Sequence, residues 1–233
     1  RERHSGKKHQ CDFISLSEAR ANKFSFDWNA YIPPIPKKCG IQVLKNYDLK
    51  LIVPEIDWTP FFQAWDLAGH FPDILKDAVV GAEATKLYHD ARQLLQKVID
   101  GKLLQANAVF GFFPANAVND DDLEVYANDD RNEVALKLHH LRQQNRKPPG
   151  VANKCLADFI APKYTGLRDY IGMFAETAGI GVDALAKKFE AEQDDYSSIM
   201  IKALGDRLAE AFAEHLHERV RKEFWGYGQS ENL

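Results

Sequence analysis

The segment 57–62 reads Asp-Trp-Thr-Pro-Phe-Phe and places a carboxylate and an indole beside a predicted turn of the chain. Thr59 is a suitable N-cap and the proline after it suits the first helical position, so we expect a strand to end here and a helix to run through Trp65 and Leu67. Asp57 would then lie at a helix N-terminus, where the helix dipole favours negative charge, and could face a cationic ligand. Trp58 could offer a stacking surface to a sulfonium or a planar base. The structural alternative is that Asp57 only caps the helix and Trp58 only packs in the core.

A second group of residues with possible chemistry lies on a predicted long helix, and its members follow one another in steps of three or four residues. They are Asp206, Glu210, Glu214 and His217. This spacing brings the side chains close to one face of the helix and could hold a metal ion. The same spacing is typical of a solvated face with alternating charges, which is the interpretation we favour. A metal-dependent hydrolase built on these residues is therefore only a third hypothesis.

The other polar clusters are interpreted as structural. His139 and His140 are adjacent at the end of a predicted strand, so their side chains diverge. The aspartates at 120–122 resemble a hairpin tip, because the spaced ligands of a calcium loop are missing. The sequence contains no glycine-rich phosphate loop and no recognisable nucleophile motif.

Composition narrows the class of protein. The chain has 233 residues, of which 45% are hydrophobic and 11% aromatic, enough for a substantial core. A net charge of -4 and scattered basic residues argue against nucleic-acid binding. No apolar run approaches the length of a membrane span, and the N-terminus lacks the apolar segment of a signal peptide, so we expect a cytoplasmic protein without a membrane partner. Cys11, Cys39 and Cys155 are odd in number and far apart, and are expected to be free, buried thiols.

The order of the predicted elements indicates one α+β domain. Residues 1–40 are predicted to form an N-terminal arm or linker, and residues 41–233 the globular domain. Within the arm we expect a short helix from Ser17 to Asn22, followed by an extended, proline-rich path. Helices are predicted over 81–100, 182–193 and 194–224, and β-strands over 42–44, 50–53, 106–113, 123–126, 133–138, 155–160 and 170–178, with turns at 114–116 and 128–130. We therefore expect a mainly antiparallel, twisted sheet flanked by helices, one of them long and C-terminal.

Several motifs, in order along the chain, carry a family resemblance. They are Ile56-Asp57-Trp58-Thr59-Pro60-Phe61-Phe62, Phe112-Phe113-Pro114-Ala115-Asn116, His140-Leu141-Arg142-Gln143-Gln144, Leu156-Ala157-Asp158-Phe159, Asp169-Tyr170-Ile171-Gly172, the helical run 209–221 and Trp225-Gly226-Tyr227. Together they resemble the activation domain of cobalamin-dependent methionine synthase over nearly all residues after about position 25.

The resemblance implies a module that binds S-adenosylmethionine within a multidomain methyltransferase, the 5-methyltetrahydrofolate-homocysteine methyltransferase of methionine biosynthesis. Its expected task is reactivation, in which cob(II)alamin is reduced by one electron and methylated by S-adenosylmethionine. The implied partners are the cobalamin-binding domain of the same polypeptide and flavodoxin or a related flavoprotein reductase. Cobalamin would be held by the neighbouring domain and zinc only by another domain of the parent enzyme. Because the chemistry belongs to cobalt, we expect no catalytic acid or base and no metal ligand in this chain.

The same resemblance carries two site residues over to this sequence. Asp57 matches the carboxylate that contacts S-adenosylmethionine in the family, and Glu210 matches a glutamate at that site. The family's Arg-Pro-x-Pro-Gly-Tyr segment would lie beyond Leu233, so we expect a C-terminally truncated domain that binds its ligand weakly and is inactive alone. The alternative function is an interaction module that docks a corrinoid domain and a flavoprotein without a working ligand site of its own.

Overall fold

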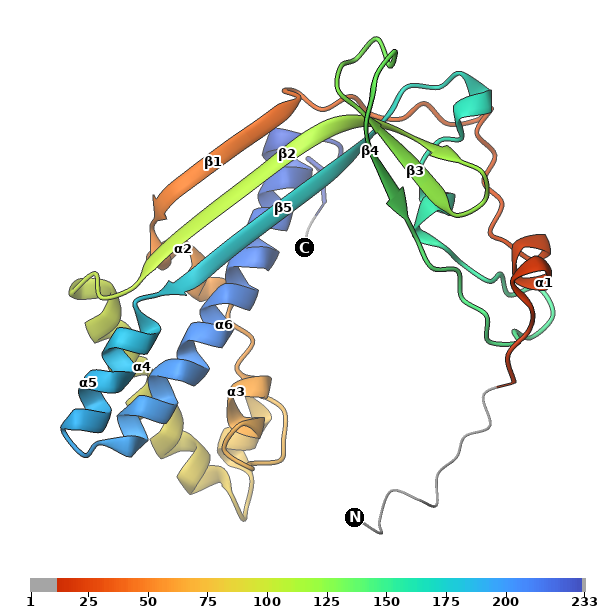
Figure 1. The fold of residues 1–233 in the computed structure, drawn as a ribbon. Helices are drawn as coiled ribbons and strands as arrows, with labels where there is room; N and C mark the ends of the chain where they lie inside the picture. The colour runs from red at the N-terminus through yellow and green to blue at the C-terminus, as the bar shows by residue number, and fades with distance from the viewer. Residues whose placement is uncertain (1–11, 232–233) are drawn as a thin grey trace. The chain divides into compact units, whose positions relative to one another are not determined.

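The computed structural model describes residues 12–231, which form two compact units. Unit 1 comprises 12–40 and Phe112–Gly172, and unit 2 comprises Ile41–Gly111 and 173–231. The strands β2 (Gln105–Val118) and β5 (Asp169–Ile180) contribute residues to both units. Figure 1 shows the course of the chain. The units are described separately below.

The elements within 12–231 give a five-stranded sheet of order β1-β2-β3-β4, with β5 also paired to β2. The remaining strands are β1 (Gly40–Tyr47), β3 (Asp122–Tyr126) and β4 (Val134–His139). The α-helices are α1 (Leu16–Ala21), α2 (Leu49–Ile52), α3 (Thr59–Gln63), α4 (Gly81–Asp100), α5 (Val182–Ala191) and α6 (Asp195–Arg219). Short 3-10 turns are η1 (Val53–Glu55), η2 (Asp73–Lys76), η3 (Leu156–Phe159) and η4 (Lys163–Thr165), and a π-helical turn, η5 (Val220–Phe224), extends α6. The predicted α+β class, with a mainly antiparallel sheet, flanking helices and a long C-terminal helix, is confirmed.

In unit 1, β2, β3 and β4 form an antiparallel meander. Ala117 of β2 pairs with Leu123 of β3, which pairs in turn with Leu138 of β4. Leu123 and Ala117 are buried together with Cys155 and Ala157. The aspartates at 120–122 end this hairpin as predicted, and His139 bonds to Asp122 through Nδ1 at 2.8 Å.

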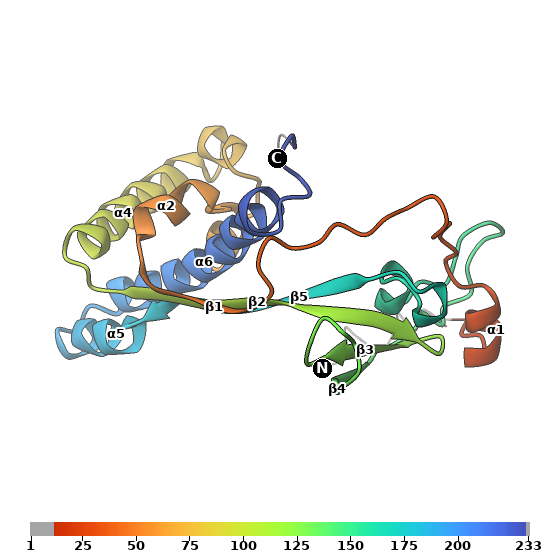
Figure 2. The same cartoon turned by 90° about the horizontal axis from the view of Figure 1, so that it is seen from above.

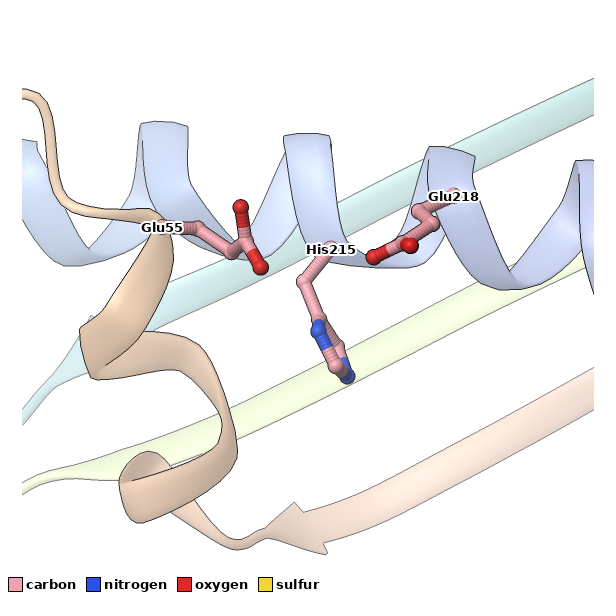
Figure 3. A group of neighbouring side chains, drawn as sticks. All are labelled: Glu55, His215 and Glu218. Atoms are coloured by element: carbon pink, nitrogen blue, oxygen red, sulfur yellow. The ribbon is translucent and has the colours of Figure 1, made fainter. Parts of the chain in front are cut away.

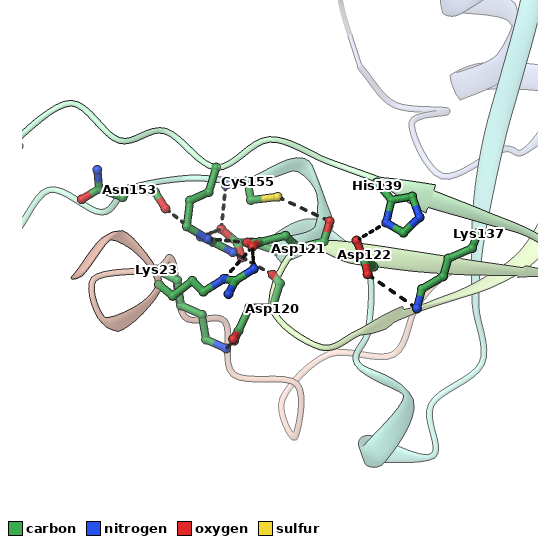
Figure 4. Close-up of polar contacts among 11 residues, drawn as sticks. Lys23, Asp120, Asp121, Asp122, Lys137, His139, Asn153 and Cys155 are labelled. Carbon is green, nitrogen blue, oxygen red and sulfur yellow. Dashed lines mark hydrogen bonds and ion pairs between the residues drawn. The ribbon is translucent and has the colours of Figure 1, made fainter. Parts of the chain in front are cut away.

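A buried arginine, Arg142, joins three loops of unit 1. Its guanidinium donates all five N–H groups: Nε to Asp121, Nη1 to the Asn153 carbonyl and to Asp158, and Nη2 to Asp158 and to the Asp120 carbonyl, at 2.7–2.9 Å. Burial alone would lower the pKa of Arg142, but its hydrogen bonds with Asp158 and Asp121 outweigh that effect and raise the pKa. Figure 4 shows the contacts around Asp121. The guanidinium is thus a fully satisfied ionic crosslink.

In unit 2, the 25-residue helix α6 supplies much of the core. Asp194 caps it by accepting the N–H of Ser197 at 2.9 Å, as its acidic start predicts. The buried stripe comprises Ile201, Leu204, Leu208, Ala211, Phe212 and Leu216. Phe212 stacks on Tyr47 of β1, with ring centroids 4.9 Å apart. Figure 2 shows α2, α4 and α6 on the same side of the strands β1, β2 and β5.

Local hydrogen bonds overturn three predicted elements. Residues 50–53 are helical, not extended, because Asp48 caps α2 by accepting the N–H of Lys50 at 3.0 Å. The predicted turn at 114–116 lies inside β2, where Asn116 pairs with Glu124 and its side chain donates to two carbonyls of a neighbouring loop. Residues 155–160 form the turn η3 instead of a strand, because Asp158 accepts the N–H of Cys155 at 2.9 Å.

Two expectations about the N-terminal residues and the thiols also change. The cap of α1 is Ser15, not Ser17, because Ser15 and Glu18 form a reciprocal capping box. Cys155 is buried, whereas Cys39 is exposed, and Cys11 lies outside the described residues. The domain limits 1–40 and 41–233 stay a prediction.

Replacing Arg142 by methionine should destabilise unit 1 strongly. The change keeps side-chain volume but removes the arginine partner of the buried Asp158 carboxylate and one of the two arginine partners of Asp121, which keeps Arg20. Breaking a buried ion pair in this way typically costs about 3–5 kcal/mol. Urea unfolding of the two proteins measures the loss. Arg146→Met is the matched control, because Arg146 pairs with Asp12 at the surface and its removal should change the midpoint little. Equal effects of the two changes would contradict the role given to Arg142.

Replacing Glu176 by glutamine should make stability less sensitive to pH. Burial raises the pKa of Glu176, one of whose oxygens has no hydrogen-bond partner among residues 12–231. A raised folded pKa favours folding while the group is protonated, and this contribution is lost as the pH rises above about 4.5 through the folded pKa. We expect Glu176→Gln to be more stable than the wild type at pH 8 and similar to it at pH 4, by thermal melting. An equal difference in melting temperature between the variant and the wild type at both pH values would contradict the raised pKa of Glu176.

Candidate functional site

Asp57 lies exposed between the turn η1 and the helix α3. Its Oδ1 accepts the N–H of Thr59 at 2.9 Å, so it helps to start the helix as the structural alternative expects. The N-cap position belongs to Trp58, and the Thr59 hydroxyl accepts the N–H of Phe71 at 3.2 Å. The prediction of Thr59 as N-cap is therefore wrong. Among residues 12–231, the second oxygen of the Asp57 carboxylate has no hydrogen-bond partner.

The chain around Asp57 differs from the prediction on both sides. The segment before it is the 3-10 turn η1, not a strand, because Asp48 has already started a helical path. The helix after it ends at Gln63, because Asp66 takes the left-handed conformation with φ 57° and does not continue the helix to Leu67. Asp57 is consequently placed by two short helical turns.

Trp58 belongs to the core and is only 6% exposed. Its ring meets Phe61 and Tyr88 edge to face, at centroid distances of 5.4 and 4.9 Å. Such aromatic packing stabilises the turn beyond the apolar area it buries. The suggested stacking surface for a ligand is therefore buried, and the structural alternative holds for Trp58.

Glu210 projects from the middle of α6 and is exposed. Its carboxylate pairs with Arg207, one turn earlier on the same helix, while its neighbours Leu208 and Ala211 face the core. An ion pair at the surface contributes little stability, so this carboxylate can exchange Arg207 for another cation at small cost.

The segments that carry Asp57 and Glu210 meet where η1 packs against α6. At this contact, ligand atoms of Glu55, His215 and Glu218 lie within 4.8 Å of one another, as Figure 3 shows. Asp57 follows Glu55 by two residues, and Glu210 precedes His215 by five, which is about 7.5 Å along the helix axis. The contact brings the two segments together, while the roles of Asp57 and Glu210 as ligand contacts stay predictions.

Two surface hollows flank this contact. One, of about 340 Å³, is lined by Glu55, Glu214, His217, Glu218 and Arg221. The other, of about 450 Å³, is lined by Tyr47, Leu51, His215, Glu218, Arg219, Lys222 and Glu223. Of the four helix residues first considered for a metal, Glu214 and His217 line the first hollow, and Asp206 and Glu210 do not.

Sequence reasoning missed Glu55, His215 and Glu218 as a group. His215 and Glu218 are three residues apart on one helix, a spacing that could have been noticed. Glu55 is 160 residues earlier in the chain, and no local pattern links it to α6. Only the packing of η1 on α6 reveals the cluster.

Comparison with known proteins shows the family to which the chain belongs. Residues 48–233 match the family described as "Vitamin B12 dependent methionine synthase, activation domain". A solved structure, described as the crystal structure of the MetH reactivation domain bound to AdoHcy, is similar with a TM-score of 0.90 and 53% sequence identity, over 95% of this chain and 67% of that one. The chain thus belongs to the family of methionine synthase activation domains. No helix within 12–231 has both the length and the apolar character needed to cross a membrane.

The structural and ligand-binding roles of Asp57 can be separated by two substitutions. Asp57→Ala removes the oxygen that accepts the Thr59 N–H and should lower stability by about 1 kcal/mol, the typical net contribution of one hydrogen bond. Asp57→Asn keeps an acceptor oxygen and should stay close to the wild type. Urea unfolding of both variants measures the difference. Equal stability of the alanine and asparagine variants would show that the hydrogen bond does not stabilise α3.

Proposed function

We propose that this chain is the S-adenosylmethionine-binding module of a cobalamin-dependent methionine synthase, and that it serves reductive reactivation of the cofactor. The observation that carries the proposal is the family match together with the similarity to a reactivation domain bound to AdoHcy. AdoHcy is what remains of S-adenosylmethionine after its methyl group has left. A site that accepts the product of methyl transfer is suited to the donor as well.

Asp57 and Glu210 are proposed as the carboxylates that recognise the ligand's positive charges. S-adenosylmethionine carries a sulfonium and an α-ammonium group, whereas AdoHcy has lost the sulfonium charge. Two exposed carboxylates on segments that pack together favour the donor, which carries the additional sulfonium charge, over its product by simple Coulomb attraction. Arg207 would be displaced from Glu210 when the ligand enters.

The reaction served by this site needs groups from outside the chain. Cobalamin, once reduced by one electron, would supply the acceptor for the methyl group of S-adenosylmethionine, and AdoHcy would be the product left at this site. We propose that cobalamin is held by a neighbouring domain of the same polypeptide and that flavodoxin or a related flavoprotein supplies the electron. The part of this chain is to hold the sulfonium methyl group in position and exclude competing reactions.

Asp57→Asn should weaken binding of S-adenosylmethionine about tenfold, because it removes a negative charge while keeping the helix start. Glu210→Gln should act in the same direction. Titration calorimetry with S-adenosylmethionine measures both, on this chain and on a version continued past Leu233. Asp48→Asn is the matched control, because Asp48 also caps a short helix in unit 2 and should leave affinity unchanged.

Two outcomes would contradict parts of this proposal. Unchanged affinity of Asp57→Asn for S-adenosylmethionine would show that the Asp57 carboxylate does not contribute to binding. If neither version of the chain binds S-adenosylmethionine while a cobalamin-bearing domain still docks to it, the chain is an interaction module and the ligand site is wrong. Binding of AdoHcy with the same response to both substitutions would show that the carboxylates do not read the sulfonium charge.

A further inference from the structure

A group of one imidazole and two carboxylates lies on the surface of unit 2, at the contact of η1 with α6. Glu55 extends from η1, and His215 and Glu218 extend from successive turns of α6 (Figure 3). Their ligand atoms lie within 4.8 Å of one another. Glu55 is exposed, while His215 and Glu218 are half-buried. The group is close to Asp57 in sequence but does not include either proposed ligand carboxylate.

Charge in this group is only partly compensated. Glu218 pairs with Lys222, one turn later on the helix. Glu55 has no hydrogen-bond or ion-pair partner among residues 12–231. The adjoining hollow is lined by one further carboxylate, Glu214, and by Arg221, whose charge is already paired with Glu231. Negative groups held this close repel one another, so a cation bound between them would relieve the repulsion.

The imidazole of His215 is held by a fixed partner. Its Nε2 lies 2.9 Å from the Tyr47 hydroxyl, which also accepts an N–H of Arg219 at 3.0 Å. Tyr47 is itself held by stacking on Phe212. When Nε2 carries the proton and donates it to Tyr47, Nδ1 is left as an unprotonated ligand atom. Metal-binding histidines are oriented in this way by a hydrogen bond to the other ring nitrogen.

We propose that Glu55, His215 and Glu218 bind a divalent transition-metal cation of the Zn²⁺ class. One imidazole nitrogen and two carboxylate oxygens form a donor set that Zn²⁺ accepts, with water completing the coordination. Mg²⁺, which prefers six oxygen ligands in octahedral geometry, suits the set less well. The site departs from the expectation that zinc belongs only to another domain of the parent enzyme.

A cation here would join η1 to α6 across segments far apart in the chain. Glu55 lies two residues before Asp57, so the ion would fix the turn that presents Asp57 without touching its carboxylate. The site rests on the geometry of these side chains and does not depend on the proposed binding of S-adenosylmethionine.

Titration of the metal-free chain with Zn²⁺, followed by calorimetry, tests the site. We expect one Zn²⁺ per chain, and at least about tenfold weaker binding in Glu55→Gln and in His215→Gln. Removing a residue that only orients a metal ligand typically lowers metal affinity by about tenfold or more, and removing the ligand itself should lower it at least as much. Glu55 is exposed and has no partner among the described residues, so its variant should fold normally, as circular dichroism will verify. Zinc-edge X-ray absorption should show one imidazole among otherwise oxygen ligands.

The matched control is His89→Gln, which removes an exposed histidine from α4 and should leave the affinity for Zn²⁺ unchanged. The absence of Zn²⁺ binding, or unchanged binding in both Glu55→Gln and His215→Gln, would overturn the proposal. Equal loss in His89→Gln would show non-specific binding and would also overturn it. Each variant is also titrated with S-adenosylmethionine, and Asp57→Asn is titrated with Zn²⁺. Because Asp57→Asn should leave Zn²⁺ affinity unchanged, failure of one proposed site can be distinguished from failure of the other.

Discussion

The arrangement of unit 2 depends on the burial of one face of α6. This helix packs against α2, η1, α3, α4 and α5, and its ring contact with Tyr47 joins it to β1. Full burial of each large apolar side chain contributes about 1.5–3 kcal/mol, so the six-residue stripe fixes the rotation of the helix. Once the stripe faces inward, Glu210, Glu214 and His217 must face outward. The acidic face that carries the proposed site is therefore a consequence of the core.

Unit 1 is organised by a different interaction, the five-donor contact of Arg142. Two of the family motifs meet there, because Arg142 belongs to one and Asp158 to the other. Two further motifs meet where Asn116 and Asp169 bond to the same loop residue, Ala161. These residues satisfy buried polar groups of the fold. Resemblance in such motifs therefore indicates a shared fold directly, and indicates a shared function only because the fold is shared.

The long apolar helices and the short strands β3 and β4 could be predicted from the sequence, whereas the short segments at 50–53 and 155–160 could not. The predicted bounds of α4 are those observed, because seven buried positions recur at helical spacing. At 50–53 and 155–160 the apolar runs predict strands, yet one aspartate hydrogen bond in each case sets a helical turn. A single side-chain cap outweighs a weak strand preference in a segment of four to six residues. Such bonds depend on local geometry that apolar patterning does not encode.

In the candidate site, too, residues within a local motif could be predicted from the sequence, whereas residues that meet only in the folded chain could not. Asp57 and Glu210 could be proposed from motifs, because each lies in a continuous run of recognisable sequence, and their roles stay predictions. Glu55 could not, because its neighbours in space come from a helix 160 residues away. A carboxylate on η1 becomes part of a binding surface only when α6 presents His215 and Glu218 to it. The same contact that hides the cluster from sequence reasoning also holds the turn η1, which ends two residues before Asp57, against α6.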